Sequence, residues 1–238
     1  MRKAILDVFT NAQIRNITFT SDMSQTRMVK TVYFLVHPGF NGDPTDGKPA
    51  YNRVNKNELF KRYKQKAAEL GEDGLMFVST HLNKPLLVNS SLFRPPYDVC
   101  SESTDKKYLS SVRKLLRDIQ AVLRNRLFIL DNSINTFGIA PSLIHPTWDI
   151  LKHEPITDSI ELIKKIAQIR GFEIPSNIDV EVFGEDLGYC VLHTAGDLYR
   201  QNYFSGKIQI DVTSSHADSP QNTCVVALKE QYPDIVFI

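Results

Sequence analysis

Cys190 is the residue of this chain whose position best suits chemistry. It lies between a buried strand expected at 178–183, followed by a tight turn at Gly184, and a helix expected to open close to the cysteine. The start of a helix presents unpaired N–H groups and a partial positive charge, and both favour thiolate over thiol. Because the thiolate is the nucleophilic form, the pattern predicts a nucleophilic cysteine. The alternative is that Cys190 is a small buried apolar residue, the commonest role of a free cysteine.

The residues around Cys190 follow a longer pattern with defined spacing. Gly184 precedes the cysteine by six residues, and the downstream positions are Val191, Thr194-Ala195-Gly196-Asp197-Leu198, and Gly206 leading into Ile208-Gln209-Ile210-Asp211. This pattern resembles the isochorismatase-like cysteine hydrolases, the superfamily that includes nicotinamidases. The resemblance covers about residues 149–215, and it departs from the family at Leu187, where the family usually has threonine.

The resemblance implies roles for further residues. Lys152, just before a helix expected at 157–170, matches the family's lysine, and an ammonium group beside a thiol lowers the pKa of that thiol. The alternative is a solvated surface lysine. The backbone N–H groups of Gly188, Tyr189 and Cys190 would hold the oxyanion of the attack step.

The third catalytic member of the family is an aspartate at the end of the first strand, and this chain has His37 at that place. A neutral imidazole can serve as a base beside a cysteine, so we expect His37 to move protons, although an inert polar residue is the alternative. Asp43 or Asp46 in the adjoining loop could reach the site instead. Asp7 would be the family aspartate only if the first strand lay in the first thirty residues, which we disfavour because no helix separates Asp7 from 31–36.

Alternating strand and helix patterns predict the fold class. Apolar runs typical of buried strands occur at 31–36, 75–79, 127–130, 178–183 and 207–213, with a terminal strand at 235–238. Helical spacing of apolar residues predicts helices at 55–70, 105–125 and 157–170. The order predicts an α/β fold with a mostly parallel sheet and helices on both faces, while the first thirty residues add a hairpin or an edge strand. Ligands of such sheets bind at the carboxyl ends of the strands, where we expect His37, Thr80, His81 and the 185–190 turn.

We expect one domain over residues 1–238, with an insertion at about 82–148, because the family has no counterpart to the 105–125 helix. Cationic residues lie outside the apolar stripe of this helix, which would suit nucleic acid or a membrane surface. The net charge of +1 instead favours a solvated outer face, so we expect no nucleic-acid partner.

Composition limits the remaining possibilities. No apolar run is long enough to span a bilayer, and Cys100, Cys190 and Cys224 are too far apart for a disulfide framework or a zinc site, which favours the cytoplasm. Isolated histidines and the lack of phosphate-binding glycine motifs predict no metal and no cofactor. The sequence therefore predicts a cysteine hydrolase that acts on a small amide through a thioacyl intermediate, with self-association left open. The alternative is a non-catalytic protein of the same fold that serves as a binding or assembly subunit.

Overall fold

The computed structural model describes residues 8–10, 26–39, 56–80, 102–131, 159–185, 187, 191–216, 225–226, 229–230 and 232–238 of the 238. Their strands are β1 (Val8–Thr10), β2 (Arg27–Met28), β3 (Thr31–Val36), β4 (Gly74–Thr80), β5 (Leu127–Asp131), β6 (Phe172–Glu173), β7 (Asp179–Glu185), β8 (Ile208–His216) and β9 (Val236–Phe237). Their helices are α2 (Lys56–Glu69), α3 (Glu102–Leu123) with a 3-10 turn at Arg124–Arg126, α4 (Ser159–Ile169) and α5 (Leu192–Arg200).

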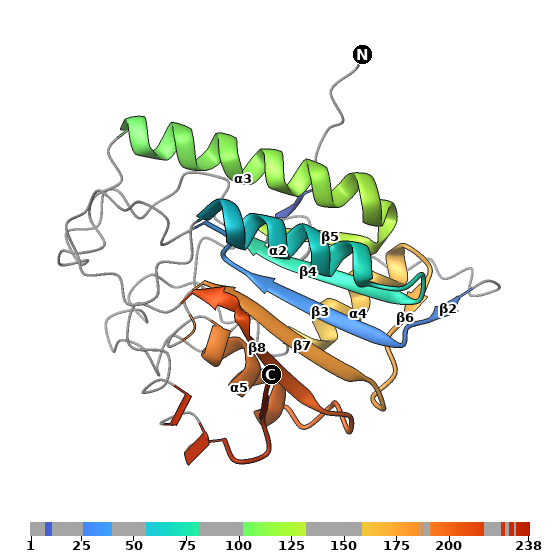
Figure 1. The fold of residues 1–238 in the computed structure, drawn as a ribbon. Coiled ribbons are helices and arrows are strands. Elements are labelled where there is room, and N and C mark those ends of the chain that lie inside the picture. The colour runs from blue at the N-terminus through green and yellow to red at the C-terminus, as the bar shows by residue number, and fades with distance from the viewer. Residues whose placement is uncertain are drawn as a thin grey trace, which may run out of the picture.

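Seven of these strands form one sheet in the order β1-β5-β4-β3-β7-β8-β9, and every neighbouring pair is parallel. Helices α2 and α3 lie on one side of this sheet, and α4 and α5 lie on the other (Figure 1). The predicted α/β class is therefore confirmed, and the strands expected at 31–36, 75–79, 178–183 and 207–213 lie parallel in one sheet, as predicted. The short strands β2 and β6 pair separately, also in parallel.

Burial on both faces explains why the central strands are continuously apolar. In β3, Val32, Phe34 and Val36 belong to one core cluster with α4 and α5, whereas Leu35 belongs to a second cluster with α2 and α3. Successive side chains of a strand point to opposite faces, so a strand covered by helices on both sides must be apolar at nearly every position. The predicted helix at 55–70 buries Leu59, Tyr63, Ala67 and Leu70 against the sheet, as its spacing indicated.

The N-terminal segment contributes an edge strand, as expected. Strand β1 pairs only with β5 at the border of the sheet, whereas β3 lies between β4 and β7. Strand β3, which ends one residue before His37, is therefore the neighbour of the strand that leads toward Cys190. This arrangement agrees with the preference for His37 over Asp7, although Asp7 itself lies outside the described residues.

The predicted turn at Gly184 is wrong, because β7 continues through this residue to Glu185. Gly184 pairs with Val36 of β3 and with Ser215 of β8, and its φ of +132° lies in a region that L side chains rarely adopt. A Cβ atom here would collide with the backbone of Val36. The missing side chain of Gly184 allows β7 and β3 to lie close together, and the chain does not turn at this residue.

Gly184→Ala is expected to destabilise the fold by about 3 kcal/mol or more, because it combines backbone strain with a collision inside the sheet. The matched control is Gly71→Ala, where a Cβ would have no atom within 4 Å and φ is not positive. That control should change the free energy of unfolding by less than about 1 kcal/mol. Urea denaturation of both variants measures the difference, and similar midpoints for the two would contradict this account of Gly184.

The segment expected to be an insertion contributes directly to the core. Strand β5 pairs with β4, and α3 buries Val112, Leu116 and Ile119 over the sheet. The described part of 82–148 is thus a strand and a helix of the main layers. Whether it is an insertion relative to other proteins of this fold stays a prediction.

Candidate active site

Buried polar side chains gather at the carboxyl ends of four neighbouring strands. His37 follows β3, Ser79 lies near the end of β4, Glu185 ends β7, and Ser215 and His216 end β8. Each of these residues is at most 6% exposed. Polar groups at such burial require specific partners, and this edge of a parallel sheet is where ligands bind. The edge is therefore the candidate active site.

His37 lies where the sequence predicted it, at the carboxyl end of β3, and is fully buried. Its backbone N–H donates to the carbonyl of Ser79 at 3.0 Å. Its φ is +43°, a left-handed conformation that costs a non-glycine residue on the order of 1–2 kcal/mol. Such strain persists only where the surroundings hold it, which is common at functional sites.

Glu185 is buried between the turn after β3 and helix α2. Its Oε1 accepts the backbone N–H of Gly39 at 2.5 Å and the hydroxyl of Tyr63 at 3.3 Å. Tyr63 is itself fully buried, and both this burial and the Glu185 carboxylate raise the pKa of the Tyr63 hydroxyl well above its ordinary value. Tyr63 therefore stays a hydrogen-bond donor throughout the physiological pH range.

An irregularity in β8 brings Ser215 and His216 alongside the end of β7. The register steps from Val182 opposite Ile210 to Gly184 opposite Ser215, so β8 has extra residues between these pairs. In this bulge the Asp211 carboxylate accepts the N–H groups of Thr213 and Ser214 at 2.8 and 3.0 Å. The Ser215 hydroxyl donates to the Asp211 carbonyl at 2.6 Å and accepts from the Gly184 N–H at 3.2 Å. Bulges of this kind often re-aim side chains next to active sites.

Lys66 of α2 binds the bulge from the side of the sheet that α2 and α3 cover. Its ammonium lies 2.6 Å from Glu181 and 2.7 Å from Asp211, and all three side chains are at most 18% exposed. Burial alone would lower the pKa of Lys66, but hydrogen bonds to Asp211 and Glu181 outweigh it and raise that pKa. Burial would raise the pKa of Asp211, yet hydrogen bonds from Lys66, Thr213 and Ser214 outweigh it and lower it. In Glu181, burial raises the pKa and Lys66 offsets only part of the effect.

The remaining predicted site residues lie outside the described part of the chain: Cys190, Lys152, Gly188, Tyr189, His81, Asp7, Asp43 and Asp46. The elements that flank Cys190 are described, because β7 ends at Glu185 and α5 begins at Leu192. The expected passage from strand to helix around the cysteine is therefore confirmed. Lys152 lies seven residues before the first residue of α4 in the sequence.

Tyr63, His216 and Lys66 were not singled out by the sequence, and Glu185 was named only as the start of the 185–190 turn. Glu185 lies two residues after the strand expected at 178–183, and His216 lies three residues after the strand expected at 207–213. Both strands run further than expected and end at these residues. Tyr63 looked like an ordinary core residue of an amphipathic helix. Lys66 offered no signal, because its partners come from strands more than a hundred residues away.

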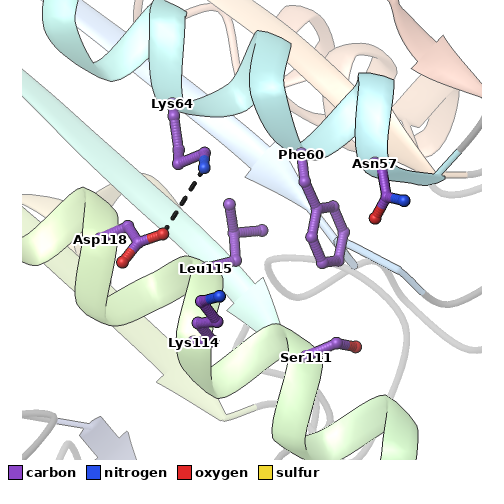
Figure 2. Close-up of a pocket in the computed structure, with 7 residues that line it drawn as sticks. All are labelled: Asn57, Phe60, Lys64, Ser111, Lys114, Leu115 and Asp118. Atoms are coloured by element: carbon purple, nitrogen blue, oxygen red, sulfur yellow. Dashed lines mark ion pairs between the residues drawn. The ribbon is translucent and has the colours of Figure 1, made fainter.

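A separate hollow of about 500 Å³ lies between α2 and α3, lined by Asn57, Phe60, Lys64, Ser111, Lys114, Leu115 and Asp118 (Figure 2). Lys64 and Asp118 form an ion pair across it at 3.6 Å. The hollow lies in the helix layer and includes none of the buried groups at the strand ends. It is therefore distinct from the candidate active site.

The outer face of α3 carries exposed basic side chains at Arg113 and Arg117. Arg126, which follows this helix, donates to the carbonyls of Leu70, Gly71 and Gly74. No helix among the described residues is long and apolar enough to cross a membrane. Within the same residues, no three His, Cys, Asp or Glu side chains are grouped to hold a metal ion. The expectation of no metal stays a prediction.

Comparison with known proteins shows where this fold recurs. No protein-family model and no curated protein matches the sequence. The structure is similar to the nicotinamidase/pyrazinamidase of Bacillus subtilis, with a TM-score of 0.50 and 13% identity over 88% of this chain and 100% of that one. A pyrazinamidase/nicotinamidase of Streptococcus mutans gives a TM-score of 0.46 and 15% identity over 87% of this chain and 99% of that one. The chain therefore shares its α/β fold with the Bacillus subtilis nicotinamidase/pyrazinamidase, in agreement with the fold class predicted from the sequence.

Proposed function

We propose that the protein is a cysteine-dependent hydrolase of a small amide or related carbonyl compound, with Cys190 as nucleophile. The observation that carries this proposal is the arrangement of β3, β7 and α5. Cys190 falls in the sequence between the end of β7 and the start of α5, and β7 pairs with β3, the strand that ends one residue before the buried His37. A nucleophile and a proton carrier supplied by neighbouring strand ends are what this chemistry needs.

The start of α5 supports an anionic cysteine. Cys190 comes two residues before Leu192, the first residue of α5, in the sequence. The N-terminal end of a helix carries a partial positive charge, which favours a thiolate or an oxyanion placed there.

In the proposed reaction, the Cys190 thiolate attacks the carbonyl carbon, and the C–S bond forms as the carbonyl π electrons move onto oxygen. The backbone N–H groups of Gly188, Tyr189 and Cys190 hold this oxyanion, while Lys152 favours the thiolate before the attack. His37, protonated because it has taken the proton of the Cys190 thiol, passes this proton to the departing nitrogen, and the C–N bond breaks to leave a thioester. Water, deprotonated by His37, then attacks the thioester and releases the carboxylic acid together with the thiolate.

His37→Ala is expected to lose most turnover, because it removes the proposed proton carrier. His37 is fully buried, so the variant also leaves a cavity and should lower the free energy of unfolding by about 2 kcal/mol or more. The variant His37→Asp restores the family's carboxylate and should recover part of the activity lost in His37→Ala. Initial rates of amide hydrolysis and urea denaturation measure these effects, and an unchanged rate in His37→Ala would transfer the role to Asp43 or Asp46.

A non-catalytic binding or assembly subunit is the second candidate. It is favoured by Leu187, which stands where the family usually has threonine and is fully buried in the core cluster under α4 and α5. An apolar core residue at this place cannot donate or accept a hydrogen bond to a substrate. A wild-type protein inert toward a broad panel of small amides, with an unreactive Cys190, would support this candidate.

The proposed chemistry also suggests the setting in which the protein works. A catalytic thiolate has to remain reduced, which favours the cytoplasm. We infer a small-molecule substrate and no membrane or nucleic-acid partner, and size-exclusion chromatography with light scattering would decide whether the chain self-associates.

A further inference from the structure

We propose that Glu185 is the positioning residue that holds the His37 turn in its active conformation, through the backbone of Gly39 and with Tyr63 as its support. The inference rests on the proposed function, since it assigns to Glu185 a role in orienting the proton carrier of that same reaction. Glu185 touches the turn and not the reacting atoms, so its effect on the reaction would act through His37.

The contacts of Glu185 define the role. Its Oε1 accepts the N–H of Gly39 at 2.5 Å, and Gly39 is two residues after His37 in the same turn. A hydrogen bond between an N–H group and a buried carboxylate is about twice as strong as one between neutral groups. Because the carboxylate is 2% exposed, little water is present to compete for it. This hydrogen bond therefore fixes the turn relative to β7.

Backbone strain makes such a fixed point necessary. His37 has a φ of +43°, which a non-glycine residue rarely adopts, whereas the φ of +83° at Gly39 is open to glycine without strain. On the β4 side, the backbone N–H of His37 donates to the carbonyl of Ser79 at 3.0 Å. Glu185 supplies the contact from the β7 side, so the turn is held from both neighbouring strands.

Tyr63 in turn fixes the carboxylate. Its hydroxyl lies 3.3 Å from the same oxygen, and its ring packs against Phe183 of β7 with the centroids 5.9 Å apart. Helix α2, β7 and the turn after β3 thus meet at one oxygen atom. Removal of this oxygen should therefore change the position of the His37 imidazole.

Glu181 provides a matched control. It lies four residues before Glu185 on β7 and faces the same side of the sheet, where it binds Lys66 at 2.6 Å. It is also buried, but it belongs to the ion cluster of Lys66 and not to the turn. A loss of buried charge at Glu181 should lower the free energy of unfolding and leave the position of His37 unchanged.

The experiment compares Glu185→Leu, Glu185→Gln, Tyr63→Phe and Glu181→Gln with the wild type. Two readouts are taken: kcat and KM for a hydrolysed amide, and the ring NMR signals of His37 in protein labelled with ¹⁵N-histidine. We expect Glu185→Leu to lower kcat roughly 10- to 100-fold with little change in KM, because a misplaced catalytic group costs about that much. Glu185→Gln keeps an oxygen that can accept the Gly39 N–H and should restore most of kcat.

The ¹⁵N chemical shifts of the His37 ring should change in Glu185→Leu, change less in Tyr63→Phe, and stay at the wild-type values in Glu181→Gln. Unmoved signals and an unchanged kcat in Glu185→Leu would overturn the inference, as would equal shifts in Glu181→Gln, which would indicate a general loosening. If the wild type hydrolyses no amide, the proposed function fails, and the NMR comparison still decides whether Glu185 positions His37. If Glu185→Leu does not fold, the same comparison between Glu185→Gln, Tyr63→Phe and Glu181→Gln applies.

Discussion

Cys190→Ala is expected to lower the rate of amide hydrolysis by at least about 10³-fold, because removal of a nucleophile removes the covalent route entirely. Stability should change little, since the substitution is small. Release of ammonia from a panel of small primary amides measures the rate, and circular dichroism with urea denaturation checks the fold.

The other two cysteines provide the controls for this prediction. Cys100→Ala and Cys224→Ala should keep kcat within about twofold of the wild type, because neither residue matches the pattern around Cys190. A Cys190→Ala protein that is folded and still hydrolyses amides at the wild-type rate would remove Cys190 from the mechanism. A loss of activity in all three variants would instead indicate damage to the fold.

Lys66→Met is expected to destabilise the protein by about 3–5 kcal/mol, because it leaves Glu181 and Asp211 buried without their cation. Methionine keeps the length of the apolar stem, so the loss reflects mainly the charge. The matched control is Lys64→Met on the same helix, whose ion pair with Asp118 is more than 40% exposed on both sides and should contribute less than about 1 kcal/mol. Urea denaturation at pH 7 compares the two, and equal losses would contradict the assignment of a buried ion cluster.

The acid dependence of the same variant has a defined sign. In the wild type the pKa of Asp211 is lowered, so its stabilising contribution is present above the ordinary value of 3.8 and is lost as the pH falls through the folded pKa. The pKa of Lys66 is raised, so its contribution is complete below 10.5 and is lost as the pH rises through its folded pKa. In Lys66→Met the two carboxylates take up protons more readily, so the destabilisation should shrink between pH 7 and pH 4.

The sheet could be predicted from the sequence because its signal is local. The run Thr31–Val36 is apolar at nearly every position, since helices cover both of its faces. Helix α2 shows its buried face in the spacing of Leu59, Tyr63 and Ala67. Patterns of this kind need no knowledge of distant residues.

The parts that could not be predicted depend on contacts between distant segments. Gly184 suggested a turn because a glycine after an apolar run usually ends a strand, and only the closeness of Val36 explains its place inside β7. Lys66 looked like a solvated helix residue, since nothing in α2 indicates that Glu181 and Asp211 face it. For the same reason Glu185 gave no sign that it binds the turn after His37.

Alkylation of the three cysteines in the folded protein tests whether Cys190 is a reactive thiolate, and it needs no knowledge of the substrate. Iodoacetamide is added near pH 7 at low concentration, and peptide mass spectrometry follows the labelling of Cys100, Cys190 and Cys224 over time. A thiolate at the start of α5 predicts that Cys190 is labelled first, and that its rate falls in a Lys152→Met variant. Labelling of Cys100 or Cys224 while Cys190 stays intact would contradict the account.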